Sequence, residues 1–177
     1  MLASIWLLPQ AVQQRALQAV IDSLADAHGT VRFQPHLTVC GSLRKIEALG
    51  VASDYVRRSD LLPLTVNKTQ VASGTESPFR AVFIEIEDSA ALCGFREALR
   101  NITGAGELHP PHISLLYTLE QQTQRPMPQL DAARLRAIAD QCQHCVGPGE
   151  FILDRAVVKT ADGSWDNVRS WAVARTL

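Results

Sequence analysis

Two pentapeptides in this chain share one pattern of residue types. Pro35–Val39 (PHLTV) and Pro111–Leu115 (PHISL) both contain proline, histidine, an aliphatic residue, a hydroxyl residue and a second aliphatic residue, and their histidines lie 76 positions apart. Side chains alternate between the two faces of a β-strand. The repeat therefore predicts two strands that bury their aliphatic residues in a core and present an imidazole and a hydroxyl on the opposite face.

Two such strands facing each other would suit the hydrolysis of a phosphate ester. One imidazole can take a proton from water while the other, protonated, gives its proton to the leaving oxygen. The hydroxyls can donate hydrogen bonds to phosphate oxygens, where charge builds in the transition state. The candidate catalytic residues are therefore His36, Thr38, His112 and Ser114. We expect no metal and no cofactor, and the symmetric pattern leaves open which histidine is the base.

Another histidine and two of the four cysteines offer weaker candidates for a site. His109 lies three residues before His112, but the two residues between them are prolines, which exclude a helix that presents both rings on one face. We expect His109 in a loop at the mouth of the site. Cys142 and Cys145 form one Cys-x-x-Cys pair, whereas a structural zinc site often needs two. We interpret this pair as small residues near a helix end.

Size and charge narrow the class of ligand. The 177 residues fit one domain, and the net charge of −1 lacks the basic excess of proteins that follow a nucleic-acid backbone. A small anionic ligand is therefore expected, rather than long nucleic acid. No apolar stretch approaches the roughly 20 residues that cross a bilayer, and the apolar start has no basic leader. We expect a cytoplasmic protein that does not bind a membrane.

Hydrophobic periodicity and turn residues predict a mixture of helices and strands. Helices are expected over Val12–Ala27, Ile46–Val56, Ala90–Asn101 and Asp131–Gln141, the last with Asp131 as its N-cap. Extended segments or strands are expected over Ser4–Leu8, Val31–Cys40, Leu62–Ala72, Ala81–Glu87, His112–Tyr117, Phe151–Thr160 and Val168–Thr176.

The two motifs resemble those of the 2H phosphoesterase superfamily, which is named for paired His-x-Thr/Ser motifs. Within it, the chain is most similar to the plant-type cyclic phosphodiesterases. The similarity spans nearly the whole chain and includes Ser4–Pro9, Ser73–Thr75, Pro111–Tyr117, Lys159–Thr160 and Trp171–Ala174. The segment Glu76–Phe79 departs from the plant enzymes, which are richer in aromatic residues there.

The resemblance implies an α+β fold over residues 1–177 as a single bilobal domain. Two antiparallel sheets would line a central cleft, with helices outside. It also implies a hydrolase that acts on a phosphoric diester, a cyclic phosphodiesterase that opens ADP-ribose 1″,2″-cyclic phosphate or nucleoside 2′,3′-cyclic phosphates. We expect this enzyme to act as a monomer.

Several further residues are candidates for contacts with the substrate. The resemblance implies that Tyr117 helps to hold it, and Trp6 and Phe79 are candidates for stacking on a base. The candidate phosphate contacts are Arg44, Arg80 and Lys159.

Two other functions remain open. The first is a 2H enzyme that acts on RNA ends, at a 2′–5′ linkage or a terminal cyclic phosphate, although the near-neutral charge argues against it. The second is a non-enzymatic 2H domain that binds AMP.

Overall fold

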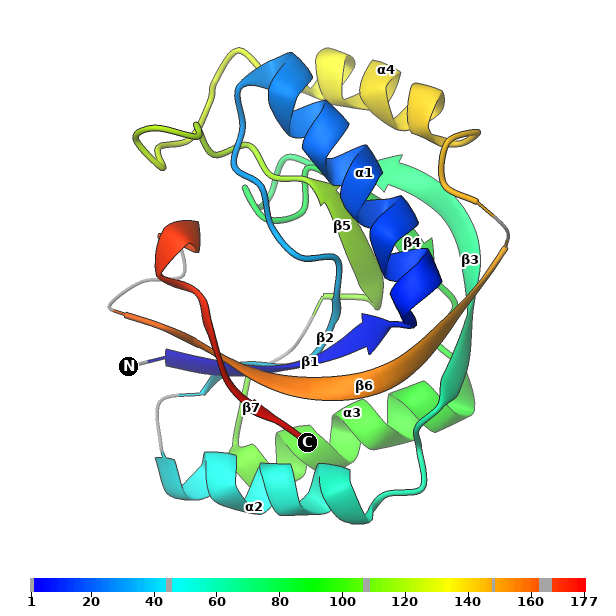
Figure 1. The fold of residues 1–177 in the computed structure, drawn as a ribbon, viewed down its shortest axis with the longest axis vertical. Coiled ribbons are helices and arrows are strands. Elements are labelled where there is room, and N and C mark those ends of the chain that lie inside the picture. Colours follow the sequence, from blue (N-terminus) through cyan, green and yellow to red (C-terminus); the bar gives the residue numbers. More distant parts are fainter. Residues whose placement is uncertain (1, 44–45, 107–108, 148, 163–166) are drawn as a thin grey trace.

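Four helices are interspersed among seven strands in the described part of the computed structural model, which covers residues 2–43, 46–106, 109–147, 149–162 and 167–177 (Figure 1). The helices in these ranges are α1 (Ala11–His28), α2 (Ile46–Arg58), α3 (Ala90–Thr103) and α4 (Ala132–Cys142). The strands are β1 (Leu2–Pro9), β2 (Leu37–Leu43), β3 (Leu64–Ser73), β4 (Val82–Ile86), β5 (His112–Leu116), β6 (Glu150–Ala161) and β7 (Ala172–Thr176). None of the described helices is long and apolar enough to cross a membrane.

The described strands form one antiparallel sheet of seven strands in the order β1-β2-β5-β4-β3-β6-β7. Strand β1 also pairs with β6, so six strands form a closed circuit of pairings and β7 adds to the edge of β6. Figure 1 shows how strongly this sheet curves. The resemblance implied two sheets, and the described strands instead connect as one, because β6 pairs with β3 at its start and with β1 along the rest of its length.

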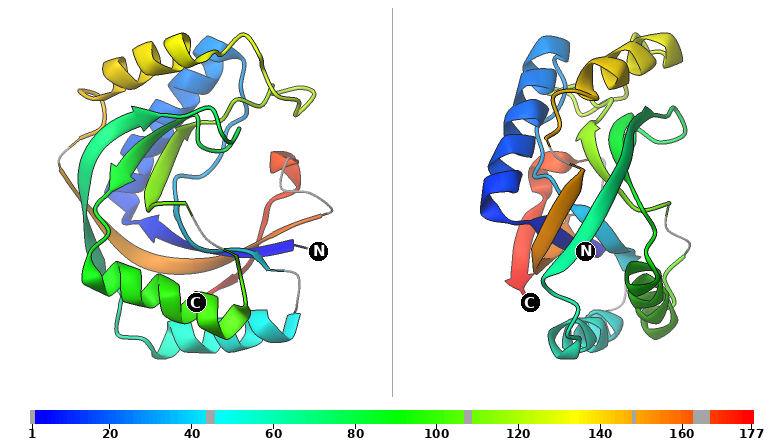
Figure 2. Two further views of the ribbon diagram at one scale, coloured as in Figure 1. Left: turned by 180° about the vertical axis from the view of Figure 1, so that it is seen from behind. Right: turned by 90° about the vertical axis from the view of Figure 1, so that its right-hand side faces the viewer.

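The helices pack on the sheet in two pairs. Helix α1 contacts β1 and β5, and α4 contacts β3 and β4, whereas α2 and α3 pack on each other and on β2. Figure 1 and the view from behind in Figure 2 show these pairs at opposite ends of the molecule. Helix α1 thus packs on the motif strand β5, and α2 and α3 pack on the motif strand β2.

Local sequence explains where the helices begin and end. The side chain of Asp131 accepts a hydrogen bond from the backbone N–H of Arg134 at 2.9 Å, so the predicted N-cap of α4 is confirmed. Helix α1 buries Leu17, Ile21 and Ala25, four residues apart on one face. It ends at Gly29, whose φ of 68° lies in the left-handed region.

The predicted order of elements is confirmed, with two corrections. Residues 31–36 have no regular structure, and the expected strand begins only at Leu37. The expected strand over Val168–Thr176 is wrong in its first part, where Val168–Ser170 form a 3₁₀ turn. The N–H of Trp171 closes the turn by donating to the carbonyl of Val168 at 3.2 Å, and β7 starts after it.

Candidate active site

The two motif strands are neighbours in the sheet. Strands β2 and β5 pair antiparallel at Leu37 and Ile113, the residues that directly follow the two histidines. The four aliphatic residues of the motifs point into the core, where Leu37, Val39, Ile113 and Leu115 are all 0% exposed. The predicted alternation is therefore confirmed. The histidine and hydroxyl of each motif point to the other face.

Both imidazole rings are fixed in the same way. Nδ1 of His36 lies 2.6 Å from the carbonyl oxygen of Gln34, and Nδ1 of His112 lies 2.8 Å from that of Pro110. A carbonyl only accepts hydrogen bonds, so each Nδ1 donates and Nε2 of the neutral ring is left with its lone pair. In both cases the carbonyl belongs to the residue before the motif's proline, a position that proline holds extended.

One cavity of about 450 Å³ collects the residues that the sequence singled out. Its described lining includes all seven predicted site residues, namely His36, Thr38, His112, Ser114, Tyr117, Trp6 and Phe79. His109 also lines it from the loop before β5, as expected for a residue at the mouth. Sequence reasoning did not identify Ser4, Gly41, Ser77, Gly106 and Trp171 as part of the lining.

Burial and neighbouring cations make both histidines weak bases. Burial lowers the pKa of His36 to about 3, with smaller contributions in the same direction from His112 and Lys159, although the bond to Gln34 opposes it. Burial likewise lowers the pKa of His112 to about 4, and the nearby side chains of Arg80, His109 and Arg96 add to the effect against the bond to Pro110. Both rings are therefore neutral at pH 7 in the free protein.

An aromatic ring on β1 covers His36. Trp6 stacks flat on the imidazole, with ring centroids 3.4 Å apart and planes 8° from parallel. The indole Nε1 donates to Oγ of Ser4 at 2.9 Å, and that hydroxyl donates to the carbonyl of Cys40 at 2.7 Å. Because this face of Trp6 is occupied by His36, the stacking partner that the structure gives Trp6 is a histidine rather than a base.

A related arrangement surrounds His112. The ring of Phe83 on β4 meets the imidazole edge-on, with centroids 5.6 Å apart. In register, Phe83 lies opposite Ser114, and Trp6 lies opposite Thr38. The repeat that the sequence reveals in two pentapeptides thus extends to the neighbouring strands, which place an aromatic ring opposite each motif hydroxyl.

A cationic side chain lies over each of the aromatic rings of Trp6 and Phe83. Nζ of Lys159 lies 5.2 Å from the centroid of the Trp6 ring, and the guanidinium carbon of Arg80 lies 4.0 Å from that of Phe83. Neither cation lines the cavity directly. Arg44, the third candidate phosphate contact, lies outside the described residues.

The two motif hydroxyls differ. The hydroxyl of Ser114 donates to the carbonyl of Phe79 at 2.8 Å, so its proton is engaged. Thr38 is half-buried on the cavity wall. Both hydroxyls line the cavity, and that of Ser114 is already engaged by the carbonyl of Phe79.

Three further aromatic residues that line the cavity, Tyr117, Phe79 and Trp171, contact one another. Tyr117 is 2% exposed and stacks on Phe33, with centroids 3.6 Å apart. Phe79 meets Tyr117 edge-on at 5.3 Å, and Trp171 lies 6.0 Å from both. Burial raises the pKa of Tyr117, so its phenol stays protonated and can only be a neutral hydrogen-bonding group.

The Cys-x-x-Cys pair lies apart from this cavity. Cys142 ends α4 and is buried, whereas Cys145 is exposed, and both are free thiols. In the ranges that the structure describes, no group of three or more histidine, cysteine or acidic residues could hold a metal ion.

Comparison with known proteins identifies the fold. No protein-family model and no curated protein matches the sequence. Among solved structures, E. coli LigT in complex with NADP⁺ is similar over 99% of this chain and 95% of its own, with a TM-score of 0.62 and 14% identity.

Two further structures agree with this assignment. A protein described as a phosphoesterase is similar over 99% of this chain and 96% of its own, with a TM-score of 0.62 and 13% identity. Usb1 of Kluyveromyces marxianus is similar over 89% of this chain and 93% of its own, with a TM-score of 0.50 and 11% identity. The chain therefore has the α+β fold of the 2H phosphoesterases.

Proposed function

We propose that this protein is a cyclic phosphodiesterase that opens small cyclic phosphates with His36 and His112. The observation that carries the proposal is the paired fixation of the two rings. Both use Nδ1 to bond a backbone carbonyl, and both line the same cavity of about 450 Å³. Two imidazoles held in this way leave two Nε2 atoms to exchange protons with one ligand.

The reaction follows from that arrangement. One neutral imidazole takes a proton from water as the water oxygen bonds to phosphorus. The other imidazole, protonated, gives its proton to the ribose oxygen as the phosphorus–oxygen bond of the ring breaks. The two rings end with their protonation states exchanged, and solvent restores them. The anionic substrate favours the imidazolium that the free protein, with pKa values of about 3 and 4, holds poorly.

Hydrogen bonds to the non-bridging oxygens would add to this acid–base chemistry. Thr38, which lines the cavity, would donate one such bond. Ser114 can donate a second by exchanging the carbonyl of Phe79 for a phosphate oxygen. Donors directed at oxygens that gain charge stabilise the transition state more than the ground state.

A nucleotide-sized substrate suits the cavity. Sites for small ligands commonly enclose about 300–1,000 Å³, and this cavity, at about 450 Å³, lies in that range. E. coli LigT, which shares the fold, has been solved with NADP⁺, ATP and 3′-AMP. With a net charge of −1, this chain suits ADP-ribose 1″,2″-cyclic phosphate or nucleoside 2′,3′-cyclic phosphates better than a polymer.

A turnover panel tests the proposal. It contains ADP-ribose 1″,2″-cyclic phosphate, the four nucleoside 2′,3′-cyclic phosphates and an oligonucleotide with a terminal 2′,3′-cyclic phosphate, and product positions are read by phosphorus NMR. We expect hydrolysis of the small compounds to a single positional isomer. A much faster rate on the oligonucleotide would instead favour an RNA-end enzyme, and tight AMP binding without any turnover would favour a binding domain.

A further inference from the structure

Lys159, on β6, is a charged side chain without a counterion. It is 8% exposed, and it is the one lysine, arginine, aspartate or glutamate that is buried within the described ranges. Its ammonium has no hydrogen bond or ion pair there, and the aromatic face of Trp6 is its recorded partner. Its Nζ is not fully buried, so an anion can reach it, and charge-assisted hydrogen bonds to that anion would be strong.

The sheet places Lys159 beside the cavity. It lies directly opposite Ser4 in the pairing of β6 with β1, and directly opposed residues project from the same face of a sheet. Ser4 and Trp6 both line the cavity, so Lys159 projects to the cavity side. Strand β1 lies between β2 and β6, so His36 and Lys159 reach Trp6 from opposite sides.

The cavity itself supplies no counterion for this ammonium. Its described lining contains no aspartate or glutamate. The aromatic face of Trp6 attracts a cation, but more weakly than a phosphate with charge-assisted hydrogen bonds would. An anion that enters the cavity is therefore the partner that the surroundings of Lys159 lack.

A counterpart cation lies on the other side of the site. Arg80 lies over Phe83 as Lys159 lies over Trp6, and its Nε is a buried donor without a hydrogen-bond partner in the described part of the chain. As a whole residue, Lys159 is the more completely buried of the two.

We propose that Lys159 binds a second, non-reacting phosphate of the substrate, so that the site prefers cyclic phosphates that carry a further phosphate or diphosphate. The inference rests on the proposed function, which places the reacting phosphate between His36 and His112. The reacting phosphate would then lie on the His36 side of the stacked rings of Trp6 and His36, and the second phosphate would lie on the Lys159 side. The ribose of the substrate would span the distance between them.

Calorimetric binding of two product-like ligands tests this inference without turnover. Adenosine 2′-phosphate carries only the phosphate that the histidines would hold, and adenosine 2′,5′-bisphosphate adds the second. We expect the wild-type protein to bind the bisphosphate at least about tenfold more tightly. Lys159→Met should bring the two affinities within about twofold of each other, because it removes the charge and keeps much of the volume. Lys159→Arg should keep part of the preference.

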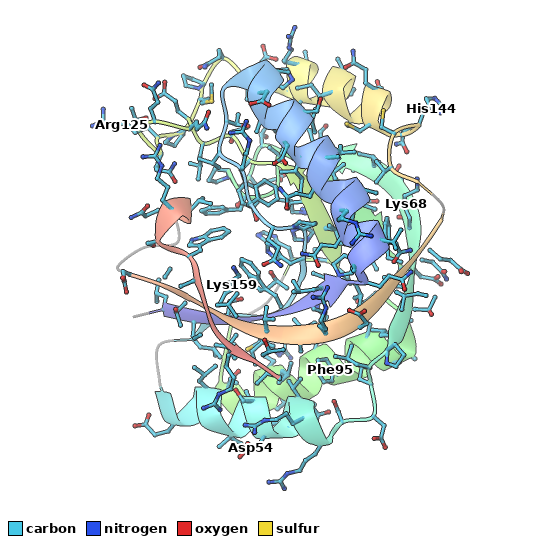
Figure 3. All side chains as sticks on the ribbon, in the orientation of Figure 1. Asp54, Lys68, Phe95, Arg125, His144 and Lys159 are labelled. Atoms are coloured by element: carbon cyan, nitrogen blue, oxygen red, sulfur yellow. The ribbon has the colours of Figure 1, made fainter. Side chains whose placement is uncertain are left out.

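Lys68→Met is the matched control. Lys68 lies on β3, and Figure 3 shows the two lysines on separate parts of the sheet. Lys68→Met removes the same charge from another part of the sheet and should leave the preference for the bisphosphate unchanged. If the preference arose only from long-range attraction to positive charge, Lys68→Met would weaken it as well.

Three results would overturn the inference, namely equal binding of the two ligands by the wild type, no measurable binding of the bisphosphate, or a preference that survives in Lys159→Met. The proposed function fails separately, by an absence of turnover on every cyclic phosphate. A protein that opens cyclic phosphates but does not distinguish the two ligands would therefore contradict the role of Lys159 alone.

Discussion

His36 and His112 occupy matching positions in two near-identical motifs, yet their surroundings differ. The first lies flat against Trp6 and is 7% exposed, whereas the second meets the edge of Phe83 and is half-buried. Their shared feature is the Nδ1 bond to a backbone carbonyl. That bond fixes the tautomer of each ring, and the environment sets how readily each takes up a proton.

The depressed pKa values predict an unusual pH dependence. In the free protein the pKa is about 3 for His36 and about 4 for His112, so both are neutral at pH 7. The reaction needs one proton on the pair, and that form becomes more populated as the pH falls. We therefore expect kcat/KM to rise by up to about tenfold per pH unit from pH 8 to pH 5. In the complex, the anionic substrate raises these pKa values, so kcat should reach its maximum at a higher pH.

Steady-state kinetics at fixed ionic strength over this range measure both parameters. A fall in kcat/KM as the pH drops from 7 to 5 would contradict acid–base catalysis by a singly protonated pair, because it would mean that a neutral pair of histidines is the reactive form.

Trp6 is expected to position His36. Trp6→Leu removes the flat surface against which the imidazole lies, so the ring loses its fixed orientation. We expect kcat to fall by about tenfold with a smaller change in KM. Trp6→Phe keeps an aromatic face and should retain more activity than Trp6→Leu. If both variants keep the wild-type kcat, Trp6 does not position the ring.

Among the elements, the C-terminal end of α4 is joined to β3 by the side chain of Gln143, the residue that follows the helix. The amide of Gln143 donates to the carbonyl of Val71 at 2.7 Å and accepts from the N–H of Val71 at 3.1 Å. These bonds satisfy both backbone groups of a residue on β3 that the helix covers.

Gln143→Ala should therefore lower the free energy of unfolding by about 1 to 2 kcal/mol. Urea unfolding measures this change. Because Gln143 does not line the cavity, kcat/KM should stay at the wild-type value. Gln143→Glu keeps the acceptor but loses the donor. Its free energy of unfolding should therefore lie between those of the wild type and Gln143→Ala. Wild-type stability in Gln143→Ala would show that water replaces both bonds without loss.

Hydrophobic periodicity and turn residues predicted most of the helices and strands, because these patterns depend on residues that are close together in the sequence. The stop at Gly29 and the cap at Asp131 act within one helical turn, and both are seen in the structure. The 3₁₀ turn at Val168–Ser170 was missed because it depends on a distant contact. The N–H of Val168 bonds the side chain of Gln124 at 3.0 Å, and Gln124 lies far away in sequence.

In the molecule as a whole, the cavity lies where the closed circuit of strand pairings has its shortest pairing. Strands β2 and β5 share one recorded residue pair, Leu37 and Ile113, while the neighbouring strands pair over longer stretches. The two motifs therefore diverge from this pair, and the cavity lies along them. The closure of β1 on β6 holds this arrangement from the other side.

The candidate site was predictable from sequence only where a pattern repeats. The motif residues stand out because chance repetition of five matched positions is rare. Trp171 also lines the cavity, but its place there depends on β7 pairing with β6, a long-range feature without a local signal. Lys159 was one of three candidate phosphate contacts in the sequence, and only the folded sheet shows that most of this residue is buried beside Trp6.

The most direct test of the central claim is kcat/KM for adenosine 2′,3′-cyclic phosphate in the presence of EDTA, measured for the wild type, His36→Ala and His112→Ala. We expect the wild type to turn over under these conditions. Each variant should lose at least about 100-fold in kcat/KM, because each removes one of the two proton-transfer groups. Wild-type activity in both single variants, or its complete loss in EDTA, would contradict a two-histidine mechanism that needs no metal.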